Sequence, residues 1–262
     1  MTIDLVYKPP WKVLQELGIF EPREIHIEAI AQHCGATIVY ETISGSEARI
    51  LGYGDRAIIT VNKNSQLPRQ RFSSAHELGH WMCDRGKIAF SCEEKIFRTE
   101  WENANPEQRA NRYAAELLMP ESMFTPQAKN LPITFDSIDI LRKTFQVSRT
   151  ATAIRLVEHG SFPAMIVCND RNRRRWFIRG PQVPDELWPL GKPGQDSGAF
   201  FLLQNPEKTR ETFDISADTW INHPESYNYS LREDSLKISP ELVVTLLWWK
   251  DERQILDLDD EY

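Results

Sequence analysis

The chain of 262 residues lacks several features that mark other classes of protein. It has no run of about 18 apolar residues, the length that would suggest a membrane-spanning helix. Residues 1–10 lack a charged segment followed by an apolar one, so we expect no signal peptide. With 41% hydrophobic and 26% charged residues, the composition is that of a folded protein, which we expect to be cytoplasmic.

Cysteine and excess positive charge are also scarce. The four cysteines show no paired spacing, and we expect free thiols in a reducing compartment at Cys34, Cys83, Cys92 and Cys168. The net charge of -7 argues against broad, non-specific binding to nucleic acid. It leaves room for a local basic patch or for a partner protein with a basic surface.

The most informative segment is His76–His80, which has the form His-Glu-x-x-His within an apolar run. Two histidines four residues apart on a helix lie on one face, where both rings can reach one zinc ion. Glu77 between them can act as a general base toward a water on that ion. Gly79 would weaken an isolated helix, so it indicates that another backbone or a substrate passes close by. The alternative is a core helix that carries these residues by chance.

The third zinc ligand must come from elsewhere, because a catalytic zinc usually has three protein ligands and a water. The longer zincin pattern fails, since Cys83 and Gly86 stand where Gly and His are needed. Asp84 is four residues after His80, but it lies about 12 Å from His76 along a regular helix. One ion therefore cannot bind both Asp84 and His76.

A second helix, expected from Pro106 to Met119, offers Glu107 and Glu116 as ligands. These two residues are about 2.5 turns apart and face nearly opposite sides, so only one of them can face the zinc. Residue types leave the two about equal. Glu102 is also near, but it precedes the expected helix.

Two segments resemble the ImmA/IrrE metallopeptidases. They are Arg71–His80 and Glu107–Pro120, and the second is similar to the family motif Glu-x-x-Ala-Asn-x-Phe-Ala-Ala-x-Leu-Leu-Met-Pro, with Tyr113 in place of Phe. The resemblance covers about residues 15–160. It implies that Glu107 is the third zinc ligand beside His76 and His80, and that Glu77 is the catalytic base.

The resemblance also implies a function, which is zinc-dependent cleavage of a partner transcriptional repressor, expected to be a helix-turn-helix protein. A regulator that binds a repressor or DNA through a zinc-stabilised fold is the alternative from another class, and a hydrolase of short peptides is a third. Residue type alone makes His33, Tyr113 and His223 candidate donors to an oxyanion. Asn111, one turn after Glu107, could orient a metal ligand or pack between helices.

The pattern of the whole chain predicts an α+β protein with two domains. Residues 1–160 are expected to form a zincin-like peptidase domain with a small antiparallel sheet and a helix-turn-helix-like pair at 136–159. Residues 161–262 are expected to form a mainly β domain of unknown role. Further helices are expected at 11–34 and 69–83, and strands at 37–41, 48–52, 57–62, 164–168, 175–178, 199–203, 211–215 and 242–249.

For three other features we favour a structural role over a functional one. The second helix of the pair carries Arg149 and Arg155, but residues 150–154 between them are uncharged and mostly small. DNA contact is therefore possible but not favoured. The basic cluster of Arg171, Arg173, Arg174 and Arg175 is expected at a solvated hairpin tip. The pair Trp248–Trp249 is expected to pack in a sheet.

Overall fold

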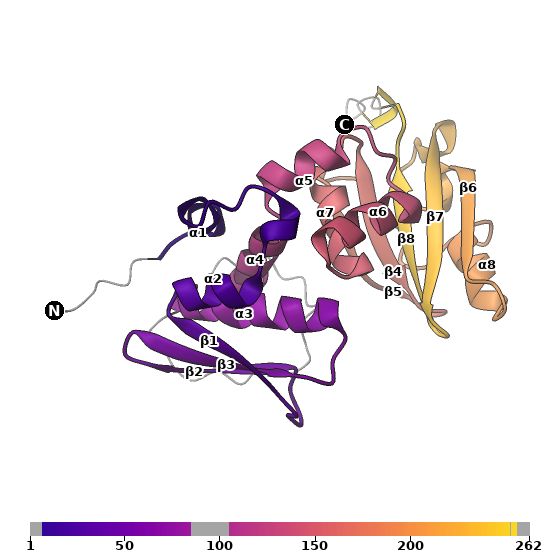
Figure 1. Ribbon diagram of the computed structural model, residues 1–262. Helices are drawn as coiled ribbons and strands as arrows, with labels where there is room; N and C mark the ends of the chain where they lie inside the picture. The colour runs from indigo at the N-terminus through magenta and orange to yellow at the C-terminus, as the bar shows by residue number, and fades with distance from the viewer. Residues whose placement is uncertain (1–6, 85–104, 252, 256–262) are drawn as a thin grey trace. The chain divides into compact units, whose positions relative to one another are not determined.

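The structure is a computed structural model that describes residues 7–84, 105–251 and 253–255 (Figure 1). Contacts divide the chain into two compact units that interleave along the sequence. Unit 1 contains the described residues up to Phe124 together with Arg142–Ser148, and unit 2 contains Thr125–Leu141 and the described residues from Arg149 onward. The predicted domain boundary at residue 160 stays a prediction. Each helix in the described ranges is too short or too polar to cross a bilayer.

Unit 1 contains a three-stranded sheet of β1 (Ala36–Glu41), β2 (Ala48–Tyr53) and β3 (Arg56–Asn62) in the order β1-β3-β2. The hairpin of β2 and β3 is antiparallel, as expected, but β1 and β3 are parallel, so the expectation of a purely antiparallel sheet is wrong on this pairing. Consecutive strands alternate in direction here. Because β3 lies between β1 and β2, β1 pairs with a strand that runs in the same direction as β1.

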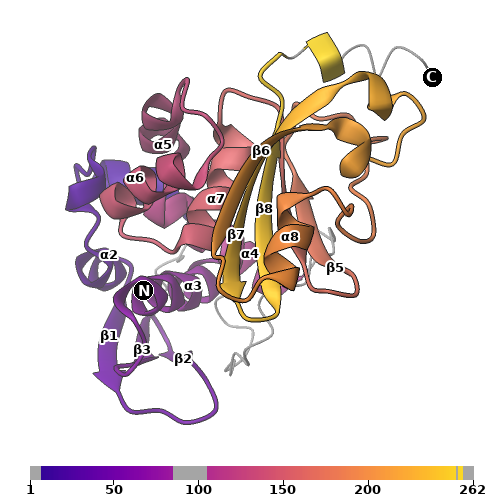
Figure 2. The ribbon, with the colours of Figure 1, turned by 90° about the vertical axis from the view of Figure 1, so that its right-hand side faces the viewer.

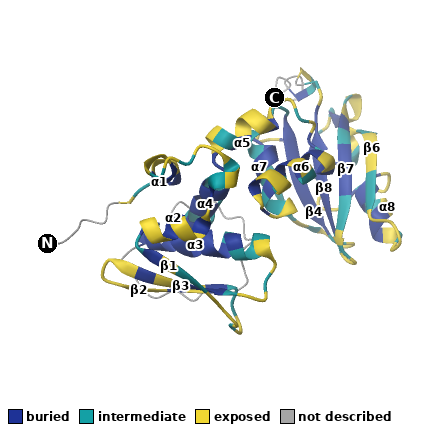
Figure 3. Cartoon of the chain, viewed as in Figure 1, coloured by how far each residue is buried: buried dark blue, intermediate teal, exposed yellow. Residues whose placement is uncertain are grey.

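The helices of unit 1 begin and end close to the predicted residues. They are α1 (Pro10–Glu16), the 3-10 turn η1 (Pro22–Glu24), α2 (Ile27–His33), α3 (Leu67–Asp84) and α4 (Pro106–Leu118). Helices α2 and α3 lie on the same face of the three-stranded sheet (Figure 1). Helix α3 is buried along most of its length (Figure 3), as its apolar flanks predicted.

Three helices follow along the chain, namely α5 (Glu121–Ala128), α6 (Phe135–Phe145) and α7 (Arg149–His159). The predicted helical pair is α6 and α7, joined at Gln146, which has a left-handed φ of 55°. Helix α5 was not predicted. Pro126 lies inside it, and proline is normally read as a helix breaker.

Unit 2 contains a five-stranded, wholly antiparallel sheet in the order β5-β4-β8-β7-β6, which confirms the mainly β expectation. Its strands are β4 (Ala164–Asn169), β5 (Arg174–Arg179), β6 (Arg210–Ser216), β7 (Ser230–Ser239) and β8 (Leu242–Trp248). Two 3-10 turns, η2 (Ala217–Thr219) and η3 (Ser226–Asn228), connect β6 to β7.

One predicted strand is wrong, because residues 199–203 lie in helix α8 (Gly198–Gln204). The hydroxyl of Ser197 accepts a hydrogen bond from the Phe200 N–H at 3.1 Å and so caps this helix. The buried side chains Ala199, Leu202 and Leu203 have helical spacing. An apolar run this short fits either type of element.

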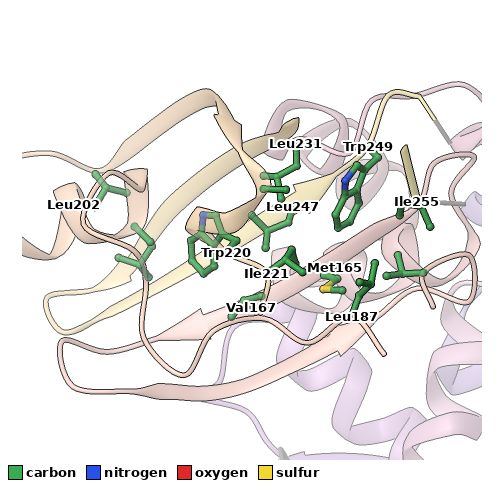
Figure 4. Packing of buried hydrophobic residues seen from close by; sticks show 14 of the residues in the cluster. Met165, Val167, Leu187, Leu202, Trp220, Ile221, Leu231, Leu247, Trp249 and Ile255 are labelled. Atoms are coloured by element: carbon green, nitrogen blue, oxygen red, sulfur yellow. The ribbon is translucent and has the colours of Figure 1, made fainter. Parts of the chain in front are cut away.

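A hydrophobic core lies between the five-stranded sheet and the segments that cover one of its faces, among them α8 (Figures 2 and 4). Trp220 and Trp249 are fully buried there, beside Met165 and Leu247. Trp248 is also buried and packs on Phe162 with ring centroids 5.1 Å apart, so the packing role predicted for the tryptophan pair is confirmed.

Buried carboxylates on β7 have hydrogen-bond partners on β7 itself and on distant segments. The Glu233 carboxylate accepts hydrogen bonds from the Ala199 N–H (2.9 Å), the Trp220 indole (3.0 Å) and the Ser235 hydroxyl (2.6 Å). The neighbouring Asp234 accepts one from the Phe135 N–H at 2.8 Å, at the start of α6. Asp234 and the exposed Asp136 both bind the guanidinium of Arg210.

Candidate metal centre

Helix α3 places His76 and His80 one turn apart on a buried face. Each residue is only 2% exposed, and the two rings meet edge to face with centroids 4.7 Å apart. Their Nε2 atoms are 3.1 Å apart. Both imidazoles therefore direct the same nitrogen into the same small space, as the four-residue spacing predicted.

Helix α4 adds the carboxylate of Glu107 to this space. The helix begins there because the Asn105 side chain accepts a hydrogen bond from the Glu107 N–H at 3.0 Å and Pro106 occupies the first turn. The Glu107 oxygens lie 3.2 Å from Nε2 of His76 and 3.3 Å from Nε2 of His80. Of the two glutamates that residue types left equal, Glu107 is the one that joins the histidines.

The donor set of this group fits a metal ion. Ligand atoms of His76, His80 and Glu107 all lie within 4.8 Å of one another. Two imidazole nitrogens and one carboxylate oxygen form a set that zinc commonly takes. The Glu107 side chain is 44% exposed while the histidines are buried, so the group is open to solvent on one side.

The electrostatics of the group keep Glu107 charged. Hydrogen bonds from His76, and then from His80, hold the pKa of the Glu107 carboxyl well below its usual range, although partial burial acts in the opposite direction. A carboxylate that stays ionised over the physiological range is available as a ligand at neutral pH.

Gly79 explains how α3 and α4 approach closely enough to share a site. A Cβ atom at Gly79 would lie 2.9 Å from both Cα and O of Ala110 and 3.1 Å from Cβ of Tyr113. The two distances to Ala110 are too short for a real Cβ atom, and the one to Tyr113 is tight. Of the two explanations that the sequence offered for this glycine, the structure favours close approach by another backbone.

Asn111 holds the outer side of His76. Its Oδ1 lies 2.9 Å from Nδ1 of His76. In the tautomer that leaves Nε2 without a proton, the Nδ1–H donates this bond and Nε2 has a lone pair for a metal. The predicted orienting role of Asn111 therefore has a matching geometry.

The remaining predicted residues take different places. Glu77 follows His76 in α3 and is 1% exposed. His33 pairs with Glu16 at 3.2 Å, and Glu102 lies outside the described residues. The ring of His223, in unit 2, accepts a hydrogen bond from the Glu225 N–H at 3.2 Å. Tyr113 is 3% exposed and packs against α3 at Gly79.

Asp84 and Arg109 form a contact beside the site that the sequence did not predict. The spacing in α3 showed that Asp84 and His76 cannot bind the same ion. Oδ2 of Asp84 lies 3.7 Å from Nδ1 of His80. Its Oδ1 is paired with Arg109, two residues after Glu107 on α4. The available signal was that each residue lies within about one helical turn of a proposed ligand.

The thiols are as expected where the structure describes them. Among the described residues, Cys34, Cys83 and Cys168 form no disulfide bond with one another, and Cys92 lies outside the described residues. Burial raises the pKa of the Cys83 thiol to about 11, and the charge of Asp84 adds to this effect.

Comparison with known proteins bears on the family and the fold of this chain. Residues 31–157 match the peptidase M78 family, described as the IrrE N-terminal-like domain, which confirms the resemblance to the ImmA/IrrE family. A solved structure described as a Mycobacterium tuberculosis transcriptional regulator is similar in fold, with a TM-score of 0.57 and 15% sequence identity. The similarity covers 91% of this chain and 85% of that one. A search of curated proteins finds no match.

Proposed function

Because residues 31–157 match the IrrE N-terminal-like domain, we propose that this protein is a zinc-dependent endopeptidase that cleaves a partner transcriptional repressor of the helix-turn-helix class. One observation carries the proposal. Nε2 of His76, Nε2 of His80 and the carboxylate of Glu107 converge within 4.8 Å of one another, on two helices of the matched segment. The family match supports a peptidase and therefore a protein substrate.

In the proposed mechanism, His76, His80 and Glu107 would hold the zinc ion. When bound, zinc lowers the pKa of a water and polarises the carbonyl of the scissile peptide. Glu77 takes the proton from the attacking water and later delivers it to the nitrogen of the leaving amine. Asn111 holds the His76 ring through its Nδ1, so that Nε2 keeps its direction during the reaction.

The regulatory part of the proposal has separate support. The similar solved structure is described as a transcriptional regulator, and its similarity extends over 91% of this chain. If the protein is a regulator, unit 2 would have a function in addition to the peptidase activity. The helical pair, α6 and α7, gives less support to a regulator that reads DNA directly. Arg149 on α7 donates two hydrogen bonds to Asp139, at 2.7 and 2.8 Å, and Arg155 is only 4% exposed.

The test is a cleavage assay with a candidate helix-turn-helix repressor as the substrate. The full chain, loaded with zinc or treated with a chelator, is incubated with the repressor beside a Glu77→Gln variant. The proposal expects cleavage that needs zinc and disappears in the variant, although zinc content and repressor binding are retained. Derepression that survives Glu77→Gln would show a non-proteolytic regulator instead.

A second substrate assay separates the endopeptidase from a hydrolase of short peptides. The zinc-loaded chain is offered a library of short peptides in parallel with the folded repressor. Selective cleavage of the repressor at one position supports the proposal. Rapid turnover of many short peptides, with the repressor left intact, contradicts it.

A further inference from the structure

Asp84 is a buried carboxylate at the last residue of α3, one helical turn after His80. Its side chain is only 3% exposed, and Oδ2 lies 3.7 Å from Nδ1 of His80. The same imidazole presents Nε2 to Glu107 at 3.3 Å. His80 thus faces the metal group with one nitrogen and Asp84 with the other.

Arg109 holds Asp84 from the neighbouring helix. Its Nη2 donates to Oδ1 of Asp84, which leaves Oδ2 on the side of His80. Arg109 lies in α4 two residues after Glu107, and its side chain is 37% exposed. This ion pair therefore connects the end of the helix that carries both histidines to the start of the helix that carries the carboxylate ligand.

We propose that Asp84 is a positioning residue for His80 and that Arg109 acts through Asp84. The inference rests on the proposed metal centre of His76, His80 and Glu107. His80 would then be oriented by a carboxylate at 3.7 Å, an electrostatic contact longer than a hydrogen bond, whereas His76 is held by the Asn111 amide at 2.9 Å. Carboxylate and carbonyl partners of this kind fix the ring and the tautomer of metal-binding histidines.

The charges explain why Asp84 needs Arg109. A buried carboxylate without a positive partner is costly, and the charged Glu107 lies nearby on α4. The guanidinium offsets the charge of Asp84, and its planar fork restricts the orientation of the carboxylate. The two helices already pack closely at Gly79, so holding them together does not require the ion pair.

The experiment measures zinc affinity of the full chain by competition with a chelator, for Asp84→Asn, Arg109→Gln and the double variant. We expect Asp84→Asn to lower the affinity about 10-fold or more, the range typical of such partners. Arg109→Gln should lower it less, and it should add nothing in the Asp84→Asn background. Arg109→Lys should restore part of the loss. Arg112→Gln, at an exposed position of the same helix, is the matched control.

Absorption spectra of the cobalt-substituted proteins provide a readout that a loss of stability alone would not move. A changed spectrum in Asp84→Asn, with Arg112→Gln unchanged, supports the inference. Unchanged affinity and spectrum in Asp84→Asn, or losses that add in the double variant, overturn it. If Asp84→Asn does not fold, partial recovery in Arg109→Lys relative to Arg109→Gln supports the inference, and its absence overturns it.

The peptidase proposal stands or falls separately from this inference. Zinc binding by the unmodified protein without any cleavage would refute the peptidase and leave the positioning role intact. Cleavage by the unmodified protein, together with unchanged zinc affinity in Asp84→Asn, would support the peptidase and refute the positioning role.

Discussion

Nδ1 of His76 lies 2.9 Å from Oδ1 of Asn111, so a residue of α4 fixes the ring of a proposed ligand on α3. Replacing Asn111 with Ala should lower zinc affinity about 10-fold, because the ring loses the acceptor that sets its tautomer. Asn111→Asp, which keeps an oxygen at this position, should lose less. Chelator competition measures both variants, and equal affinity in Asn111→Ala and the unmodified protein would contradict the assignment.

The choice between the two glutamates of α4 can be tested directly. Glu107→Ala should lose most bound zinc, because it removes one of the three converging ligands. Glu116→Ala should bind zinc normally. Metal content after dialysis, measured by mass spectrometry, decides the matter, and the opposite pattern would show that the third ligand is wrong.

Gly79→Ala should reduce both stability and zinc affinity. The added methyl group would meet Ala110 backbone atoms at 2.9 Å, so α3 and α4 must separate. Overpacking of this kind costs about 1–3 kcal/mol of unfolding free energy. Gly191→Ala is the matched control, because no atom lies within 4 Å of its added Cβ. Urea unfolding of both variants gives the comparison, and equal stabilities would refute the close approach.

The Cys83 thiol should react slowly at pH 8 and much faster near pH 11, because burial raises its pKa to about 11, above the ordinary value of a thiol. An unfolded chain ionises this thiol at lower pH, so its contribution to stability falls as pH rises from about 9 to about 11. Asp84→Asn should speed alkylation at a given pH, since the charge of Asp84 also raises the pKa. Iodoacetamide labelling, read at the Cys83 peptide by mass spectrometry, tests both expectations. Rapid labelling at pH 8 would contradict the first.

Glu233→Ala should destabilise unit 2 by about 3 kcal/mol or more, because three buried donors lose their acceptor at once. Glu233→Gln keeps one acceptor oxygen and should cost less. The exposed Glu241 provides Glu241→Ala as the control. Tryptophan fluorescence during urea unfolding reports the change, since Trp220 donates to the replaced group.

The sequence predicted local features of the fold better than non-local ones. Helices α3 and α4 and the strands β1 to β3 follow from periodicity and from start and stop residues. The parallel pairing of β1 with β3 depends on strand order, which no local pattern records. Strand β7 was missed because its central residues are polar, and Asp234 finds its partner Phe135 99 residues away.

The site shows the same division. The spacing of His76 and His80 on one helix fixes their relation, so two converging imidazoles could be predicted. Residue types did not separate Glu107 from Glu116, and only resemblance to a family favoured Glu107. The ion pair of Asp84 and Arg109 spans two helices, and it could not be foreseen from either helix alone.

The bond from the Phe135 N–H to Asp234 also bears on how the chain is synthesised. A ribosome releases α6 about 99 residues before the carboxylate that caps it, and Arg210, which binds both Asp136 and Asp234, emerges between them. The start of this helix is therefore completed only after most of the C-terminal sheet has left the exit tunnel. Any fragment that stops at residue 160 would leave that backbone N–H without its acceptor.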